Sequence, residues 1–574
     1  MLRRIFSYMK EYKKYAWLAL ICIGVEVVLE IMVPKLMADL IDIGVTNSDV
    51  PYIITKGIQM AVCAVAALIL GVGSARFSAL AGQGLGANIR KAEYEKLQSY
   101  SFFNIDHFSV SSLVTRLTSD VTNIQNAVST GMRPFGRSPV MLIFATTLAF
   151  KINSTLALVF LVALPVLAVL LIIIIINVGP RYGRMQGAVD LVNRCIEENL
   201  TAVRVVKSYV RGDYEIEKFG HVNDNLKNES EKAFGIAVLN MPAMQFVMYS
   251  TILGILLIGG RLINSGLMIG QLTSFLSYVL LILNSLMMMS NVFLLMTRSL
   301  ASAERIMKVI DEPIDITDEN AKDIEVKKGE IEFNHVWFKY KDTAKEYVLS
   351  DVSFHINAGQ TVGIIGQTGS SKTTLIQLIP RLYDASKGEI KIDGINVKEY
   401  PVRHLRDAIS VVLQKNTLFS GSLIDNLRWG NENATLDEIK EACSIACVDE
   451  FIDRLPGGLD AEMGQEGVNV SGGQKQRICI ARAILKKPKV LILDDSTSAV
   501  DTATEGKIRN ALANKLPDMT KIIIAQRISS VRHADQIIIM DGGCVNAIGT
   551  HESLLKTNKI YQEIYESQKE GADL

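Results

Sequence analysis

The sequence predicts a multidomain membrane protein in which an all-α half of six membrane-spanning helices precedes a soluble α/β half. Of the 574 residues 49% are apolar, and the long uncharged runs lie before residue 300. Beyond residue 360, short apolar strands alternate with a glycine-rich turn and helical segments. A chain of this length has room for both halves. Its formal net charge of +0 argues against a nucleic-acid partner, because such proteins rely on excess positive charge.

Six apolar segments are candidates for membrane spans, since a spanning helix needs about 20 largely apolar residues. They are 16–40, 57–75, 138–150, 152–180, 233–260 and one span after the turn-forming residues near the start of 262–297. The segment 138–150 is short between Arg137 and Lys151, so its helix must extend into polar surroundings or turn its charged ends outward.

The distribution of basic residues predicts the orientation in the membrane. Arg3, Arg4, Lys10, Lys13 and Lys14 precede the first span, whereas the first connection, "IDIGVTNSDVPYIIT", contains no Lys or Arg. The positive-inside rule therefore places the N-terminus in the cytoplasm. Six spans return the chain to that side, so we expect the C-terminal soluble half in the cytoplasm as well.

Two long connections on the cytoplasmic side, 76–132 and 181–232, are charged and helical in pattern. We expect the spans to continue through them as long cytoplasmic helices. Within them, "SFFNIDHF" (101–108) and "YVRGDYEIEKF" (209–219) combine aromatic anchors with charges and are the predicted contact points with the soluble half. The alternative is a solvated helical hairpin that contacts nothing.

Two acidic residues, Glu26 and Glu30, lie one helical turn apart in the first span and therefore share a face. Ionisable groups at membrane depth are costly, so they usually face a cavity or a partner. Two interpretations stay open. The pair lines a cavity that attracts cationic or amphipathic substrates, or it is a structural pair neutralised by Lys35 or by a neighbouring helix.

The soluble half contains a phosphate-binding pattern, "TVGIIGQTGSSKTTLIQLI" (361–379), in which an apolar strand leads through a glycine-rich loop into a helix. In the template G-x-x-x-x-G-K-[ST], backbone N–H groups and the helix N-terminus hold phosphates. Lys372 is expected to reach the β- and γ-phosphates and Thr373 a Mg²⁺ ion. The predicted phosphate-binding residues are Gly366, Gly369, Ser370, Ser371, Lys372, Thr373 and Thr374.

Ser371 replaces the glycine that precedes the lysine in this template. A positive φ at this position would cost about 1–2 kcal/mol for a serine. Since the loop enters a helix here, we expect ordinary helical φ at Ser371 and phosphate binding that survives the substitution.

Two further segments narrow the choice among nucleotide-binding families. "VSGGQKQR" (470–477) opens a helix, and "VLILDD" (490–495) follows it as a buried strand that ends in two acids. Together with the P-loop and the six spans, this order resembles the ATP-binding-cassette family, and within it the half-transporter exporters, over essentially the whole chain. The resemblance implies a transmembrane domain (1–300), a linker (301–328) and a nucleotide-binding domain with a helical subdomain (329–574).

The resemblance also implies roles for individual residues, all of them toward Mg²⁺·ATP as cofactor. Tyr340 corresponds to the aromatic residue that stacks on adenine, although a core tyrosine at a strand end is the alternative. Asp494 corresponds to the acid that orders Mg²⁺, and Gln414 to the glutamine that senses Mg²⁺ and joins the cassette to the membrane half. Asp501 ends an interfacial loop, "SAVD" (498–501). The signature motif, which binds the ATP of an opposite cassette, is Ser471, Gly472, Gly473 and Gln474.

Two departures from the family pattern fall on the hydrolysis reaction. Asp495 stands where relatives carry the catalytic Glu, and Gln526 where they carry the switch His. A carboxylate withdrawn by about one ångström can lower a rate on the order of a hundredfold, and Gln cannot take a proton at neutral pH. We therefore expect a degenerate catalytic pair that binds ATP and turns it over slowly.

The intact signature and the degenerate pair together predict one subunit of a heterodimeric exporter in a bacterial cytoplasmic membrane. Its partner would be a second half-transporter, and its substrates small amphipathic compounds, drug-like or possibly lipid or peptide. Two alternatives stay open. One is a homodimer with two slow sites, and the other is an ATP-gated channel or regulatory subunit on the same scaffold.

Overall fold

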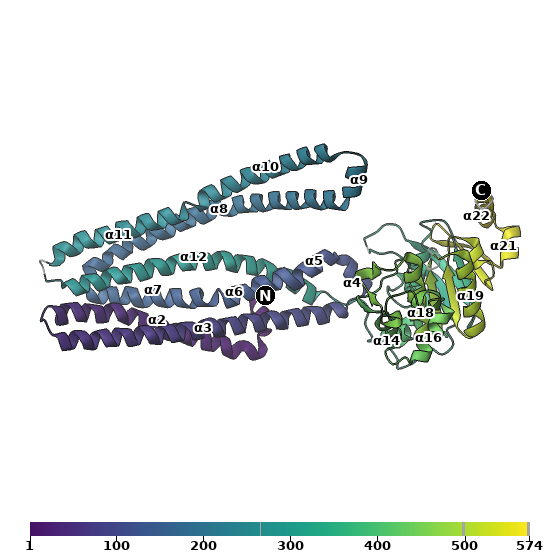
Figure 1. Cartoon of the computed structure of the whole chain (residues 1–574), viewed down its shortest axis with the longest axis horizontal. Coiled ribbons are helices and arrows are strands. Elements are labelled where there is room, and N and C mark those ends of the chain that lie inside the picture. Colours follow the sequence, from purple (N-terminus) through teal and green to yellow (C-terminus); the bar gives the residue numbers. More distant parts are fainter. Residues whose placement is uncertain (264–265, 342, 496–499, 571–574) are drawn as a thin grey trace. The chain divides into compact units, whose positions relative to one another are not determined.

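The computed structural model describes residues 1–263, 266–341, 343–495 and 500–570. The chain divides into two compact units (Figure 1). The first consists of 1–98 and 110–312, and the second of 99–109 and 313–574. The segment 99–109 thus interrupts the first unit in sequence but belongs to the second in space.

The first unit is all-α and is built from long helices (Figure 1). Within the described residues, six helical segments are long and apolar enough to cross a membrane: Lys10–Val45, Val50–Gln98, Val110–Ile152, Ser154–Thr201, Gly212–Ile263 and Ile269–Met289. Each overlaps one of the predicted spans, so the predicted number is confirmed. The single helix over Val50–Gln98 has 49 residues. At 1.5 Å per residue it is about 70 Å long, far more than the hydrocarbon core of about 30 Å requires.

The helices of this unit pack as neighbours along their lengths (Figure 1). Helix α2 packs against α3 and α7, α12 packs against α7 and α2, and α8 packs against α10 and α11. The helices are α1 (Leu2–Ser7), α2 (Lys13–Asp39), α3 (Val50–Gln98), α5 (Val110–Thr115), α6 (Val121–Ser129), α7 (Met132–Ile152), α8 (Ser154–Thr201), α9 (Val203–Ser208), α10 (Gly212–Ala237), α11 (Asn240–Ile263) and α12 (Ile269–Asp311).

The short apolar run 138–150 is completed by polar residues, as the sequence predicts. Helix α7 begins at Met132, so it includes Arg133 and Arg137 before the apolar run starts. Asn153 separates α7 from α8, and its Oδ1 accepts a hydrogen bond from the Leu156 amide at 3.0 Å. This side-chain cap satisfies a backbone donor at the start of α8.

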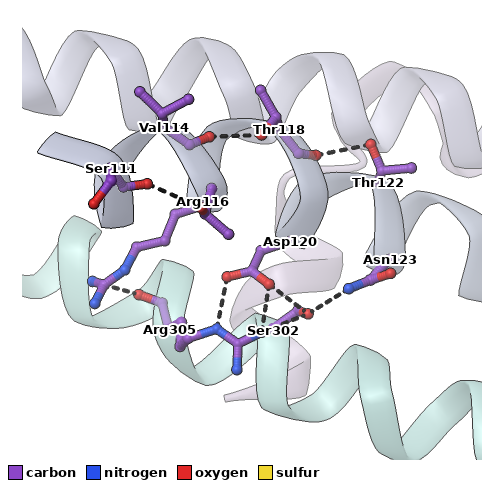
Figure 2. A network of polar contacts seen from close by, with 10 residues as sticks. Ser111, Val114, Arg116, Thr118, Asp120, Thr122, Asn123, Ser302 and Arg305 are labelled. Atoms are coloured by element: carbon purple, nitrogen blue, oxygen red, sulfur yellow. Dashed lines mark hydrogen bonds and ion pairs between the residues drawn. The ribbon is translucent and has the colours of Figure 1, made fainter. Parts of the chain in front are cut away.

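A buried polar network joins the segment around Asp120 to α12 (Figure 2). Asp120 ends the π-helical turn η3 (Arg116–Asp120), which leads into α6, and is 1% exposed. Its carboxylate accepts hydrogen bonds from Arg305 Nε at 2.8 Å and from Ser302 Oγ at 2.9 Å. Asn123 Nδ2 donates to the same Ser302 hydroxyl at 3.1 Å, and Arg116 Nη1 donates to the Arg305 carbonyl at 3.2 Å. Both carboxylate oxygens of Asp120 therefore have partners.

The expected linker begins later than predicted. Helix α12 continues to Asp311, so the first part of the segment 301–328 is helical. Arg4 Nη1 bonds Asp311 Oδ2 at 2.8 Å and ties the N-terminal helix to the end of α12.

The second unit is an α/β domain with two main sheets. The antiparallel sheet has the order β2-β1-β4-β5, and the six-stranded sheet has the order β12-β11-β3-β10-β9-β6. In the six-stranded sheet all neighbours are parallel except β11 and β12. The central strands β9 and β10 are buried along their whole length, as expected for a sheet covered on both faces. The strands are β1 (Ile331–Phe338), β2 (Leu349–Ile356), β3 (Thr361–Ile365), β4 (Lys387–Ile392), β5 (Ile395–Asn396), β6 (Ile409–Val412), β7 (Gly421–Ser422), β8 (Glu462–Met463), β9 (Val490–Asp494), β10 (Thr520–Ile524), β11 (Gln536–Asp541) and β12 (Cys544–Gly549).

Helices surround these sheets, and three of them follow one another between β7 and β8, in the domain where a helical subdomain is predicted. They are α15 (Leu423–Arg428), α16 (Leu436–Ile445) and α17 (Asp449–Ile452). The other helices of the unit are α4 (Phe102–His107), α13 (Lys372–Leu378), α14 (Val402–Asp407), α18 (Gly472–Leu485), α19 (Thr502–Lys515), α20 (Ile528–Val531), α21 (His551–Thr557) and α22 (Lys559–Glu570).

The predicted contact segment 101–108 forms helix α4 and packs within the second unit. Tyr383 donates its hydroxyl to Asp106 Oδ2 at 2.7 Å, and its ring lies 6.0 Å from that of Phe102. Asn104 Nδ2 donates to the Pro313 carbonyl at 2.8 Å. This contact point is confirmed, whereas 209–219 lies in the first unit with exposed side chains and stays a prediction.

We predict that Asp120→Ala destabilises the first unit by about 3 kcal/mol, because removing one partner leaves Arg305 without its carboxylate. The measurement is the thermal unfolding midpoint of the purified chain in detergent. The matched control is Glu95→Ala, which removes only an exposed ion pair with Lys91 and is expected to change stability by less than about 0.5 kcal/mol. Equal midpoints for the two variants would contradict the structural role of the network.

Candidate nucleotide-binding site

The site is assembled by the register of the six-stranded sheet. Ile524 at the end of β10 pairs with Ile364 of β3 on one side and with Asp494 of β9 on the other. Val412, which ends β6, pairs with Leu493. The segments that follow these four parallel strands therefore leave from one edge, where ligands of open α/β sheets bind.

Lys372 begins helix α13 directly after the glycine-rich loop. Its Nζ donates to the carbonyls of Gly366 at 2.8 Å and Gln367 at 2.9 Å, and to Ser370 Oγ at 3.2 Å. Burial lowers the pKa of Lys372, and the nearby carboxylates of Asp494 and Asp495 partly offset this effect. The ammonium thus lies over its own loop, close to two acids.

The backbone of this loop corrects the expectation for Ser371. Its φ is +69° and its ψ is 23°, which is left-handed rather than helical. For a residue with a Cβ this conformation costs about 1–2 kcal/mol, whereas glycine, the residue of the template, adopts it without that cost. Gly366 is required for a different reason, since a Cβ there would lie 2.2 Å from the Met540 carbonyl oxygen.

Asp494 is buried, and only one of its oxygens is hydrogen bonded among the described residues. Thr373 Oγ1 donates to Asp494 Oδ1 at 3.2 Å, whereas Oδ2 has no hydrogen-bond partner. Burial raises the pKa of Asp494, the bond from Thr373 lowers it in part, and the neighbouring Asp495 raises it further. A hydroxyl and a buried carboxylate with a free oxygen are ligands that fit Mg²⁺, which usually takes one or two protein oxygens plus phosphates and water.

The two positions that are expected to be degenerate contact each other. Gln526 Nε2 donates to Asp495 Oδ2 at 2.9 Å. Asp495 has a φ of +47°, a conformation that Asp tolerates better than most residues. Burial raises the pKa of Asp495, and the Gln526 bond lowers it in part. The carboxylate that would have to act on water is therefore already an acceptor for a neutral amide.

One residue of this region escaped the sequence analysis. Gln568 of α22 donates its Nε2 to the Gln526 carbonyl at 2.7 Å, and its Oε1 accepts from the Ile528 amide at 2.8 Å. Gln568 thus bonds two backbone groups of the switch segment (522–530), which lie 42 and 40 residues before it in sequence. No local motif marks such a residue, because its partners are backbone groups.

Tyr340 and Gln414 lie beside the loop and at the same sheet edge, respectively. The Tyr340 hydroxyl shares a hydrogen bond of 2.9 Å with Thr374 Oγ1, so the tyrosine is in contact with the helix that follows the P-loop. Its ring packs edge-on against Phe338 and Tyr383, as the core alternative also requires. Gln414 is exposed just beyond β6.

The signature residues form a separate, exposed helix N-terminus. Ser471 caps α18 by accepting from the Gln474 amide at 3.3 Å, while Gln474 Oε1 accepts from the Ser471 amide at 2.9 Å. Ser471 and Gly472 are exposed, and in the described part of the chain none of the hydrogen bonds of Ser471 or Gln474 reaches the P-loop. An exposed helix N-terminus of this kind favours an anion.

Asp501 serves as a helix cap. Its Oδ1 accepts from the Thr504 amide at 2.9 Å at the start of α19, and this bond lowers its pKa. The predicted interfacial loop 498–501 is described only at Val500 and Asp501, because 498 and 499 lie outside the described residues.

In the first unit, the two glutamates of the first span are neutralised by a neighbouring helix. Glu26 Oε1 accepts from Arg133 at 2.6 Å and from Arg137 at 3.4 Å, and Glu30 Oε2 accepts from Arg137 at 2.6 Å. The expected partner on a neighbouring helix is thus a pair of arginines of α7, while Lys35 is exposed, and the choice between a structural pair and a substrate cavity stays open. These arginines were missed because they flank the shortest apolar run.

Comparisons with known proteins match parts of both units to families of ABC transporters. Residues 16–286 match the family described as the ABC transporter transmembrane region, and residues 349–498 match the family described as ABC transporter. An uncharacterized ABC transporter ATP-binding protein, YfiB of Bacillus subtilis, is 37% identical over 100% of both chains.

Two relatives have more specific names, and one solved structure shares the fold. An ATP-dependent lipid A-core flippase of Desulfotalea psychrophila is 33% identical over 82% of both chains. The putative multidrug export protein YgaD of Bacillus subtilis is 32% identical over 84% of this chain and 83% of its own length. A bacterial Atm1-family ABC exporter solved with ATP bound has a TM-score of 0.84 at 21% identity, covering 97% of this chain and 99% of its own.

We predict that Ser371→Gly removes about 1–2 kcal/mol of backbone strain and raises the unfolding temperature of the nucleotide-free chain. Because the strain is already present without nucleotide, the ATP affinity is expected to change by less than about threefold. The unaltered chain still binds ATP. The matched control is Thr368→Gly in the same loop, where φ is negative and glycine brings no relief. Thermal unfolding without nucleotide and calorimetric titration with ATP measure both variants, and an unaltered chain that binds no ATP would contradict the prediction.

We predict that Asp494→Asn raises the unfolding temperature of the nucleotide-free protein at pH 7. Because the folded-state pKa of Asp494 is raised, the folded state binds the extra proton, and stability falls as pH rises from the ordinary value of about 3.9 through the folded pKa. The advantage of the variant therefore shrinks as pH falls toward about 4. Asp501→Asn is the control with the opposite sign, since the pKa of Asp501 is lowered and its variant gains nothing at pH 7.

Proposed function

The chain belongs to the ATP-binding-cassette (ABC) transporter family, and from the geometry of its site we propose that it is one subunit of a heterodimeric, ATP-driven exporter. In this proposal it moves amphipathic compounds out of the cytoplasm. The names of two relatives, a lipid A-core flippase and a putative multidrug exporter, support an amphipathic substrate class. The six candidate spans and the basic N-terminus support a membrane location with both termini in the cytoplasm.

The observation that carries the proposal is the hydrogen bond from Gln526 to Asp495. A carboxylate that acts as the general base needs a free oxygen directed at the attacking water. The neighbouring switch residue should also be able to take up a proton as the phosphate reacts, as a histidine can. Asp495 is one methylene shorter than Glu, its Oδ2 is occupied, and Gln526 stays neutral. The site built on this chain's own P-loop thus holds ATP and hydrolyses it slowly.

The residues around that site can still bind the nucleotide. In this proposal Lys372 and the loop amides hold the phosphates, and Tyr340, which contacts the helix after the P-loop, stacks on the base. Mg²⁺, when bound, neutralises phosphate charge, and Thr373 and Asp494, with Gln414, are the residues that would hold it. The exposed signature, Ser471 to Gln474, is free to complete the site of a second cassette.

The conformational step follows from the same parts. ATP held between two cassettes draws them together, and helix α4, bonded to the cassette through Asp106 and Tyr383, carries this motion into the membrane helices. The cavity between the two sets of spans then opens outward. Hydrolysis at the site on the partner's P-loop, which is catalytically active in this proposal, returns the two subunits to their starting conformation. ATP retained at Lys372 keeps the two cassettes partly in contact.

The heterodimer predicts an asymmetric response to mutation. In the complex purified from native membranes through a tag on this chain, Lys372→Ala is expected to retain most of the ATPase activity. Gly472→Asp is expected to reduce it by about a hundredfold or more, because it places a negative charge where the partner's γ-phosphate binds. Steady-state phosphate release measures both variants.

Gly506→Asp on α19 is the matched control, since a Cβ there meets only the Arg509 side chain, at 3.9 Å, and the residue lies on no predicted phosphate site. It is expected to leave the rate unchanged. Equal loss for Lys372→Ala and Gly472→Asp would instead indicate a homodimer with two equivalent sites.

A further inference from the structure

A cavity of 770 Å³ lies within the first unit between α2, α3, α7 and α12. Its α3 wall is a stripe of small and apolar residues on one helical face: Ala64, Ala67, Leu68, Gly71, Val72 and Ala75. A Cβ at Gly71 would lie 3.1 Å from Glu26 Oε1 and 3.2 Å from Arg133 Nη2. The stripe therefore starts against a charged cluster and continues to Ala64, about 10 Å along the helix.

The charged cluster is neutral as a whole. Two glutamates of α2, Glu26 and Glu30, face two arginines of α7, Arg133 and Arg137, and all four line the cavity. Arg137 bonds both glutamates. A purely cationic ligand would meet two arginines here, and a purely anionic one would compete with the glutamates for them.

The cluster is also incompletely bonded. Glu26 is 2% exposed, yet its Oε2 has no hydrogen-bond partner in the described part of the chain. Arg133, whose side chain is 40% exposed, makes one side-chain hydrogen bond among the described residues, to Glu26 Oε1, although a guanidinium carries five donors. Glu26 Oε2, a buried acceptor, and several N–H donors of Arg133 therefore line the same cavity without a hydrogen-bond partner in the described part of the protein. A pair with only a structural role would be expected to satisfy the buried oxygen.

We propose that this cavity binds the head group of a zwitterionic amphiphile. The ammonium group of the ligand donates to Glu26 Oε2, and its phosphate or carboxylate accepts from Arg133. The apolar chain of the ligand lies along the stripe from Gly71 to Ala64. This ligand leaves the cluster neutral, which neither a cation nor an anion does.

The proposal names the substrate class of the proposed exporter and so rests on that function. It differs from simple attraction of cations by the two glutamates, because the arginines cancel their charge. The affinity comes from pairing opposite charges at a fixed spacing, and the apolar wall selects for a chain.

The test is equilibrium binding of fluorescent lysophosphatidylethanolamine to the full chain in nanodiscs without nucleotide. Competitors of matched chain length are lysophosphatidylethanolamine, Nα-dodecanoyl-lysine, lysophosphatidylglycerol and dodecyltrimethylammonium. We expect the first two, which are zwitterionic, to compete at least about tenfold better than the anionic and the cationic compound, as one or two charged hydrogen bonds imply. Stronger competition by lysophosphatidylethanolamine than by Nα-dodecanoyl-lysine would show that the site recognises a phospholipid head group. Equal competition by these two compounds would show that it recognises only a pair of opposite charges.

Glu26→Gln and Arg133→Gln are each expected to weaken binding about tenfold or more. Glu95→Gln, on the exposed face of α3, is the matched control and is expected to bind normally. Ala67→Phe fills the apolar wall without touching a charge, so it tests the cavity even where a charge variant fails to fold. It too is expected to abolish binding while the unfolding temperature is unchanged.

Equal competition by all four compounds, or undiminished binding by both Glu26→Gln and Ala67→Phe, would overturn the proposal. Because nucleotide is absent, the binding result is independent of ATP turnover. If the ATPase response to Lys372→Ala and Gly472→Asp is not asymmetric, the proposed heterodimer is overturned but the binding result is unaffected. If the binding experiment fails, the heterodimer proposal is likewise unaffected.

Discussion

The parallel pairing of β10 with β3 on one side and β9 on the other is the constraint on which the nucleotide site depends. Ile524 aligns with Ile364 and with Asp494, so the P-loop, the acid and the switch segment leave the sheet at one level. A slip of one residue would turn every side chain of the strand to the opposite face. Continuous burial of β9 and β10 makes such a slip costly, since both faces are packed.

Three buried carboxylates differ in how many of their oxygens are hydrogen bonded. Asp120 has partners for both oxygens, from Arg305 and Ser302, and it joins η3 to α12 (Figure 2). Asp494 and Glu26 each keep one buried oxygen without a partner among the described residues. An unsatisfied buried group costs stability, and the two proposals give each of these oxygens a ligand, Mg²⁺ for Asp494 and an ammonium group for Glu26.

The departures from the family pattern also have a backbone component. Ser371 and Asp495 both adopt positive φ, one before the phosphate-binding helix and the other after the buried strand β9. Strain of this kind persists only where the surrounding structure holds it, and it concentrates at functional sites. The surroundings here are the packed sheet and the bond between Gln526 and Asp495, with Gln568 holding the switch segment from α22.

The sequence alone determined the six spans, the P-loop, the acid at Asp494 and the capped signature helix at Ser471, because these follow from run length and short-range spacing. It also located the contact segment 101–108, whose aromatic and charged residues are local. Only the tertiary structure decided the left-handed φ of Ser371, the pairing of Glu26 with Arg133, and the role of Gln568. Each of these depends on groups brought together from distant parts of the chain, and neither hydrophobic periodicity nor motif spacing records which distant groups will meet.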